Sequence, residues 1–269
     1  PGQVRVRINI GAINFPDVLV VANTYQVKVP VPFVLGSEYA GTVVEVADDA
    51  EGVTLGDRVF GSTIVGAFAE EIVVAPTSLM RIPAGVDDRT AAAFGVAYRT
   101  AYHVLRSVAV LQPGEELVVL GAGGGVGSLA GQLAKLRGAR VVGIAGGTEK
   151  CRHVVERLGF DACIDHRAPE WRQQLDAATP DGIDLDFENV GGDHLQAALN
   201  HMNPFGRIPA CGMISQYNNS APAPGPNNLG IIVRQRLTIR GFILSDHAAV
   251  PERCSVRRIE QPVLELEGA

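Results

Sequence analysis

The stretch of sequence that decides the fold is Leu117–Gly127, which reads LVVLGAGGGVG. Its first four residues are apolar without alternation, as in a parallel strand that is covered on both faces. Five glycines follow within seven residues, and apolar residues then recur at helical spacing from Val126 to Ala134. A strand, a glycine turn and a helix in this order predict a dinucleotide-binding turn; a flexible turn without a ligand is the alternative.

The glycine turn has a direct physical use. Its backbone N–H groups can approach a pyrophosphate, and the N-terminus of the following helix adds partial positive charge. The spacing Ala122-x-Gly124-x-x-Gly127 is a variant of the strict GxGxxG pattern. The residues expected to contact a dinucleotide here are Gly124, Gly125, Val126 and Gly127.

Length and composition bound the protein class. The chain has 269 residues, of which 46% are hydrophobic and 19% charged, as in a well-buried globular protein of one large or two medium domains. The net charge is −6 and no long basic run is present, which argues against a nucleic-acid partner. Four scattered cysteines without a CxxC pair argue against a disulfide framework, so we expect a cytoplasmic protein. No apolar run has transmembrane length, so we expect no membrane partner.

Residues 1–96 contain many short candidate strands with turn signals at close spacing, which predicts a small β-barrel or half-barrel. Examples are the alternating segment Val4–Ile10 and the segment Thr42–Ala47. The sequence starts at the edge of a strand, so we expect an N-terminal piece to be missing.

Five motifs in this half carry a family resemblance. They are GAINFPDVL, PFVLGSEYAGTVVEV, GDRVFG, GAFAEEIVV and AAAFGVAYRTAYHVL. In order and spacing they resemble the quinone-oxidoreductase branch of the medium-chain dehydrogenase/reductase superfamily. The resemblance implies an α/β protein with a GroES-like β-barrel catalytic domain over residues 1–96. A Rossmann domain with a doubly wound parallel sheet would follow over 97–245, and residues 246–269 would form an aberrant or truncated tail.

The zinc-dependent members of this superfamily carry a Cys after the first strand and a Gly-His-Glu triplet. Those places hold Asn14 and Ser37 here, which are poor zinc ligands beside thiolate and imidazole. No Cys or His occurs in residues 1–102. We therefore expect no catalytic zinc and no metal Lewis acid in the reaction.

Two residues could take the place of the metal in binding a substrate carbonyl. Asn14 has an amide N–H, and Tyr25 has a phenol on a loop. The resemblance implies that both line the active site of the zinc-free enzymes. A turn-forming asparagine and an ordinary loop aromatic are the alternatives.

The segment Ala91–Val110 is apolar at helical spacing and predicts one linking helix. Thr100 lies on it and matches a family threonine that faces the nicotinamide. A helix hydroxyl that bonds to the preceding turn is the alternative for Thr100.

The end of the second parallel strand, Ala139–Ala145, predicts the cofactor. NAD-preferring folds place an acid there for the ribose 2′-hydroxyl, but this chain has Gly146 and Gly147. Glycine gives room for a 2′-phosphate and Lys150 offers an opposite charge, which favours NADPH. A solvated lysine is the alternative for Lys150, and Glu149 is expected to cap the helix facing away from the ligand.

The third strand precedes His166, where many relatives have Tyr beside the 2′-phosphate. His166 and Arg167 could assist binding there, or they could belong to a surface loop. Three acids on the fourth strand are expected to be solvated or capping. They are Asp184, Asp186 and Glu188.

In this half, the motifs DGIDLDFENVGG and RIPACGMISQYNN resemble the prostaglandin reductase/leukotriene B4 dehydrogenase branch, which includes NADPH-dependent alkenal reductases. The resemblance implies that Lys150, Asn189 and Tyr217 contact cofactor or substrate; a loop aromatic is the alternative for Tyr217. Strand ends should also bring further residues to the nicotinamide. They are Gly212, Met213, Ile214 and Phe242.

The expected protein is an NADPH-dependent reductase of quinones or α,β-unsaturated carbonyls, with a small-molecule substrate. Asn14, Tyr25 and Tyr217 would orient the substrate carbonyl. The alternative is a protein that binds NADPH with little turnover and acts as a scaffold. A zinc alcohol dehydrogenase is a third possibility, and it would lose activity on chelation. The family resemblance leaves a homodimer open.

Overall fold

The computed structural model describes residues 2–219, 221 and 224–244, and the expected C-terminal tail over 246–269 lies outside these residues. The chain forms two compact units, of which the first ends at Arg99 and the second begins at Thr100. Among the described residues, no helix combines the length and the apolar character needed to cross a membrane.

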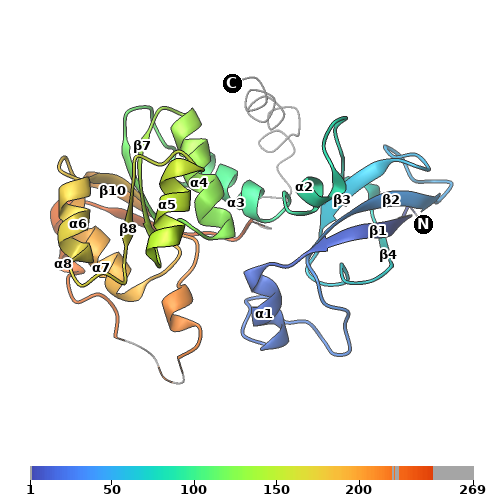
Figure 1. Ribbon diagram of the computed structural model, residues 1–269. Coiled ribbons are helices and arrows are strands. Elements are labelled where there is room, and N and C mark those ends of the chain that lie inside the picture. Colours follow the sequence, from blue (N-terminus) through green and yellow to red (C-terminus); the bar gives the residue numbers. More distant parts are fainter. Residues whose placement is uncertain (1, 220, 222–223, 245–269) are drawn as a thin grey trace. The chain divides into compact units, whose positions relative to one another are not determined.

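The first unit is built on a five-stranded antiparallel sheet with the order β4-β1-β2-β3-β5. The strands are β1 (Val4–Ala12), β2 (Glu38–Val46), β3 (Arg58–Ser62), β4 (Glu71–Val74) and β5 (Leu79–Arg81). The helices are α1 (Phe15–Val21) and α2 (Asp88–Ala92), and a 3₁₀ turn, η1, spans Pro76–Ser78. Figure 1 shows this sheet in blue and cyan, with α1 following β1. The alternating burial of β1 matches its sequence pattern.

Apolar side chains cover both faces of this sheet, as a barrel-like fold requires. One cluster includes Val6, Tyr39 and Val59, and the other includes Ala40 and Phe60 together with residues of α2. Successive residues Tyr39 and Ala40 belong to different clusters because neighbouring side chains on a strand point to opposite faces. The arrangement is the GroES-like fold expected from the sequence.

The second unit is built on a six-stranded parallel sheet with the order β11-β10-β9-β6-β7-β8. The strands are β6 (Glu116–Leu120), β7 (Arg140–Ala145), β8 (Ala162–Asp165), β9 (Ile183–Phe187), β10 (Met202–Ala210) and β11 (Thr238–Gly241). This is the doubly wound Rossmann order, in which the winding direction reverses between β6 and β9. Ligands of such sheets bind at the carboxyl ends of the strands beside this reversal.

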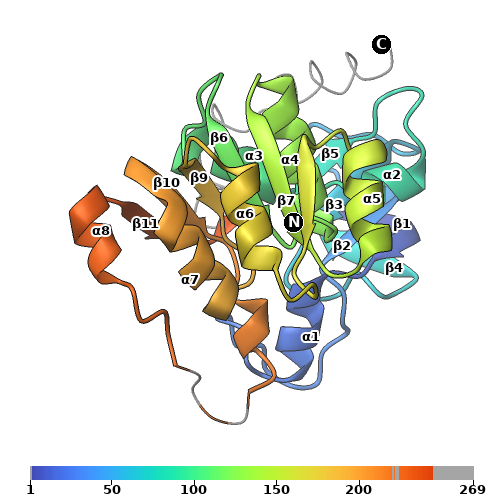
Figure 2. The ribbon, with the colours of Figure 1, turned by 60° about the vertical axis from the view of Figure 1, so that its left-hand side comes forward.

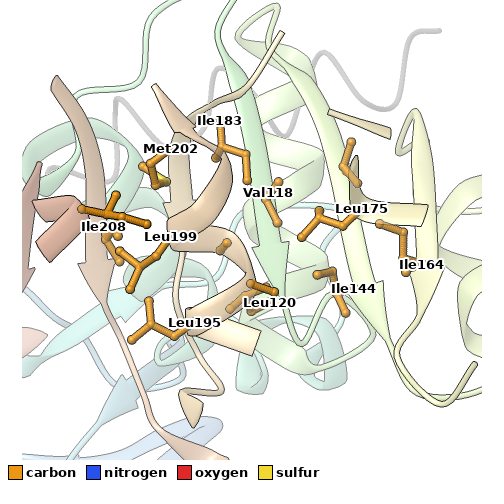
Figure 3. Close-up of a cluster of buried hydrophobic side chains, with 14 of the residues drawn as sticks. Val118, Leu120, Ile144, Ile164, Leu175, Ile183, Leu195, Leu199, Met202 and Ile208 are labelled. Atoms are coloured by element: carbon orange, nitrogen blue, oxygen red, sulfur yellow. The ribbon is translucent and has the colours of Figure 1, made fainter. Parts of the chain in front are cut away.

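Helices cover the two faces of the parallel sheet (Figure 2). They are α4 (Gly125–Leu136), α5 (Thr148–Glu156), α6 (Trp171–Ala178), α7 (Gly192–His201) and α8 (Gly230–Gln235), with a 3₁₀ turn, η3, at Ile214–Gln216. Leu175 of α6 and Leu199 of α7 pack with Val118 and Ile144 of the sheet in one buried cluster, which Figure 3 shows. This central core fixes the strand ends that carry the candidate site.

The expected single helix over Ala91–Val110 is wrong. The chain forms α2, then a turn over residues 93–96, then α3 (Ala97–His103) and a π-helical turn, η2 (Val104–Val108). The interruption has a steric cause, because a Cβ at Gly95 would lie 2.5 Å from Oγ of Ser62 and 2.8 Å from Oε1 of Glu38. The backbone N–H of Val96 also donates to Glu38 (2.6 Å), which holds the turn against the sheet.

Candidate functional site

The glycine turn between β6 and α4 has the geometry of an anion-binding turn. Gly121 has a φ of 72°, and α4 begins at Gly125 with Gly124 as its N-cap. A Cβ at Gly127 would lie 2.3 Å from the carbonyl oxygen of Gly121, so only glycine allows the helix to start this close to the turn. The first N–H groups of a helix have no partner within the helix, and those of α4 start at Gly125 and Val126.

Three predicted residues meet at the end of β7. A Cβ at Gly146 would lie 2.7 Å from Nε2 of His166, and one at Gly147 would lie 3.4 Å from Nη1 of Arg167. Asp165 accepts hydrogen bonds from the backbone N–H groups of Gly147 (2.8 Å) and Arg167 (3.0 Å). These bonds lower the pKa of Asp165, and its negative charge interacts with the two backbone N–H groups. The structure thus brings Gly146, Gly147 and His166 together, and Arg167 lies beside the two glycines.

Lys150 lies beside the glycine turn. A Cβ at Gly123 would lie 3.6 Å from Cδ of Lys150, and both residues line a surface hollow with Glu149 and Arg152. The expectation that Glu149 caps α5 is wrong, because the N-cap is Gly147 and makes no side-chain capping hydrogen bond, and Glu149 faces the hollow. A glycine at the N-cap leaves the first turn of the helix open toward the strand end.

An aromatic cluster supports His166. Its ring lies 4.8 Å from the ring of His194, which stacks on Trp171 at 5.2 Å. Burial, and then the charge of His166, lower the pKa of His194 to about 4, so His194 is neutral at physiological pH. No local pattern indicates His194, because α7 brings it to His166 from 28 positions away.

A second group of predicted residues meets beyond β9 and β10. Nδ2 of Asn189 donates to the carbonyl oxygen of Leu120 (2.9 Å) at the end of β6. The N–H of Met213 donates to the hydroxyl of Tyr217 (2.9 Å), and the N–H of Ile214 donates to the carbonyl oxygen of Asn189 (3.1 Å). A Cβ at Gly212 would lie 3.3 Å from that hydroxyl. The strand ends are therefore tied together at the reversal point of the sheet.

Thr100 and Phe242 lie in one neighbourhood of the second unit. Thr100 is 9% exposed on α3, and His103 lies one turn further along the same helix. The ring of Phe242, which follows β11, lies 6.0 Å from the ring of His103. This contact brings the chain after β11 to α3.

The first unit contributes Asn14 and a residue that the sequence did not single out. Asn14 is the N-cap of α1, and its Nδ2 donates to Oε2 of Glu38 (2.7 Å). The backbone N–H of Asn14 donates to Asp17 (2.7 Å). Glu38 is 1% exposed, and burial raises its pKa above the ordinary value. Tyr25 follows α1 and is half-buried, with its backbone N–H donating to Leu19 (3.2 Å).

The donor atoms around Asn14 do not fit a catalytic zinc. Ser37 is 7% exposed, and its Oγ and that of Ser62 have no hydrogen-bond partner within the described part of the chain. The nearby donors are an amide, hydroxyls and carboxylates, whereas catalytic zinc sites are built mainly from imidazole and thiolate. Among the described residues, no group of three His, Cys, Asp or Glu side chains could hold a metal ion.

The three acids of the fourth strand were expected to be solvated or capping, and two of them are not solvated. Asp186 and Glu188 are fully buried because β9 is a central strand with both faces covered. Glu188 accepts from the N–H groups of Val190 and Gly191, and burial raises its pKa to about 7. Burial and the charge of Glu188 raise the pKa of Asp186 well above its ordinary value. Asp184 accepts from the N–H of Glu116 (2.9 Å).

Comparison with known proteins adds the family. A family model described as "Alcohol dehydrogenase GroES-like domain" matches residues 1–84, and one described as "Zinc-binding dehydrogenase" matches residues 125–259. The chain belongs to the medium-chain dehydrogenase/reductase superfamily. The family expected from the sequence is therefore confirmed. The word zinc describes the family model, and the donors around Asn14 do not fit that metal.

Among relatives in this superfamily, the NADPH-dependent curcumin reductase of Escherichia coli is 47% identical over 150 residues, which cover 54% of this chain and 44% of the relative. Prostaglandin reductase 1 of Rattus norvegicus is 41% identical over 152 residues, covering 56% of this chain and 46% of the relative. The chain thus spans about half the length of these curated relatives.

Solved structures agree with the fold. The quinone oxidoreductase of Escherichia coli in complex with NADPH superposes with a TM-score of 0.86 at 26% identity, covering 99% of this chain and 80% of the other. The CurA protein of Vibrio vulnificus in complex with NADPH gives a TM-score of 0.82 at 29% identity, covering 99% of this chain and 80% of the other.

Proposed function

We propose that this chain is a zinc-independent, NADPH-dependent oxidoreductase that reduces quinones or α,β-unsaturated carbonyls. The observation that carries the proposal is the glycine turn, with Gly127 packed on Gly121 and Lys150 beside Gly123. The names of the relatives and of the superposed structures support the same cofactor and reaction type.

The residues present fit NADPH. The turn leaves no room for a Cβ at Gly127, and its backbone N–H groups over Gly124–Gly127 would hold the pyrophosphate. Lys150, His166 and Arg167 would hold the 2′-phosphate, because Gly146 and Gly147 stand where NAD-preferring folds place an acid and bring no negative charge. Asn189, Gly212 and the adjacent residues to Ile214, together with Thr100 and Phe242, would line the nicotinamide end.

NADPH, when bound, supplies the hydride. The chain's own groups bind and orient the other partner, since Asn14, Tyr25 and Tyr217 carry N–H or O–H donors for a carbonyl oxygen. Donors that are aimed at the oxygen where negative charge develops lower the barrier most. The hydroxyl of Tyr217 accepts from the N–H of Met213, which holds the phenol at the ends of β9 and β10.

The test is a cofactor titration and a turnover assay. Binding of NADPH and of NADH is measured for the wild type, for Lys150→Ala and for Lys28→Ala, whose exposed lysine lies in the first unit. Lys150→Ala should lose preference for NADPH, and Lys28→Ala should keep it. Oxidation of NADPH above the blank with 1,4-naphthoquinone or an alkenal supports the enzyme, whereas tight binding without turnover supports a scaffold.

The proposal also includes a location in the cell and an oligomeric state. The absence of a membrane-spanning helix among the described residues is compatible with a cytoplasmic location, which fractionation of cells would test. The edge strand β11 is exposed at all four positions, and pairing of this edge in two copies would give a homodimer. The mass of the protein in solution tests whether this homodimer forms.

A further inference from the structure

Glu38 is a buried carboxylate for which the proposed function provides no task. It stands at the start of β2 and is 1% exposed. Its Oε2 accepts from Nδ2 of Asn14 (2.7 Å) and its Oε1 from the N–H of Val96 (2.6 Å), and the backbone of Gly95 adds a further hydrogen bond to the carboxylate. The carboxylate therefore links the start of α1 to the turn before α3.

Burial of this carboxylate is costly. Among the ion pairs of the described residues, none includes Glu38, so its negative charge is compensated by hydrogen bonds alone. A buried acid without a cation destabilises the fold relative to an apolar side chain of similar size. A costly acid next to a candidate site residue indicates a functional task for it.

Asn14 is held from two sides. Asp17 is 3% exposed and accepts from the backbone N–H of Asn14, while Glu38 accepts from its side chain. An ionised carboxylate is only an acceptor, so an amide turned with its oxygen toward Glu38 would be repelled. The bond to Glu38 therefore fixes which end of the amide faces inward, and with it the directions of the second N–H and of Oδ1.

We propose that Glu38 is a positioning residue, which fixes the orientation of the Asn14 amide so that this amide meets a substrate carbonyl in one orientation only. The inference rests on the proposed function, in which Asn14 touches the substrate. Pre-orientation matters because a donor that is already aimed loses no freedom when the reaction begins.

The role requires an ionised Glu38. Protonation makes one oxygen a donor and a weaker acceptor, so the hydrogen bond from Asn14 or from Val96 weakens and no longer fixes the amide. The groups that face the carboxylate among the described residues are Asp17 from α1, Ser62 from β3 and the backbone of residues 95–96, and burial, with the charge of Asp17, raises its pKa. Turnover should therefore fall on the acid side at a pH above that of an ordinary glutamate.

The experiment is a double-mutant cycle on turnover. Glu38→Gln, Asn14→Ala and the double variant are compared with Asp88→Asn, a control in which an acid on the same unit that accepts from Nδ2 of Asn9 (2.7 Å) and pairs with Arg58 is neutralised. Glu38→Gln should lower kcat about tenfold or more, as expected for a hydrogen bond to a charged group. The Kd for NADPH should stay within about twofold, since the proposed pyrophosphate and 2′-phosphate contacts lie elsewhere.

The decisive result is non-additivity. If Glu38 acts through Asn14, the double variant has the kcat of Asn14→Ala alone, whereas independent losses that multiply overturn the inference. The acid limb of the wild-type kcat profile should also disappear in Asn14→Ala, which tests the same link if Glu38→Gln does not fold. An acid limb that persists unchanged in Asn14→Ala overturns the inference that Glu38 acts through Asn14. A wild type without any turnover overturns the proposed function, whereas an active wild type with independent losses overturns only the role of Glu38, so the two failures are distinguishable.

Discussion

Asp186 and Glu188 stand two positions apart on one face of the central strand region, where both are fully buried and the charge of Glu188 adds to burial in raising the pKa of Asp186. Val118 of β6 is the register partner of Asp186, so this acid faces the apolar core of the second unit. Two buried acids at this distance cannot both be ionised cheaply.

This pair predicts that stability falls as pH rises. The folded protein binds protons more tightly than the unfolded chain because the pKa values of both acids are raised. The stabilising contribution is therefore fully present at a pH below the pKa that these acids have in the unfolded chain, about 4. It is lost as pH rises through the pKa of Glu188 at about 7. Urea unfolding between acidic and neutral pH measures this, and a midpoint that rises with pH would contradict it.

Asp186→Val should stabilise the protein near neutral pH. Both carboxyl oxygens of Asp186 lack a hydrogen-bond partner among the described residues, and an unsatisfied buried polar group costs about 1–3 kcal/mol. The urea midpoint should rise, and the pH dependence described above should shrink. The exposed Asp181 on the same unit is the control, and Asp181→Ala should leave the midpoint unchanged. If the Asp186→Val variant were unfolded or had a lower urea midpoint than the wild type, the buried acid would be needed for stability.

The sequence predicted those parts of the fold whose signals are local. The strand, turn and helix around Gly121–Gly127 were predicted because the apolar run and the glycines adjoin each other in the chain. The expected Ala91–Val110 helix was wrong because its break depends on Glu38 and Ser62, which are more than thirty positions from Gly95. Periodicity contains no information about such a distant partner.

The candidate site divides in the same way. Gly146 and His166 were predicted from strand ends and family motifs, and the structure places them side by side. Glu38 and His194 were missed because their importance arises from contacts across the fold, with Asn14 and His166 respectively. The burial of Asp186 was missed because the alternation of acids along the strand resembles a half-exposed strand, while sheet order makes β9 central.

Gly127→Ala should weaken cofactor binding and stability together. The added Cβ would lie 2.3 Å from the carbonyl oxygen of Gly121, a backbone atom that can move only if the turn and α4 separate. An overpacked contact of this kind costs roughly 1–3 kcal/mol. Gly225→Ala is the control, because its Cβ would meet nothing within 4 Å. Thermal unfolding and NADPH titration measure both effects, and an unchanged affinity would remove Gly127 from the pyrophosphate site.

Arg167→Ala should reduce affinity for NADPH much more than for NADH. Nη1 of Arg167 lies 3.4 Å from the Cβ position of Gly147, beside the space that we assign to the 2′-phosphate. Loss of a charge-assisted bond to phosphate costs about 1.5–3 kcal/mol, or roughly tenfold to a hundredfold in Kd. Arg240→Ala is the control, since Arg240 lies exposed on β11 at the opposite edge of the sheet. Equal losses for both nucleotides would place the phosphate elsewhere.

Chelation should leave turnover unchanged. The positions that hold zinc ligands in zinc-dependent relatives hold Asn14 and Ser37 here, and the Asn14 amide is already bonded to Glu38 at 2.7 Å. Amide and hydroxyl oxygens bind zinc far more weakly than thiolate and imidazole, so no metal should be retained through purification. NADPH oxidation is compared before and after dialysis against 1,10-phenanthroline, with its non-chelating isomer 1,7-phenanthroline as the control. A selective loss with the chelating isomer, reversed by added zinc, would mean that a metal takes part and that the role assigned to Asn14 is wrong.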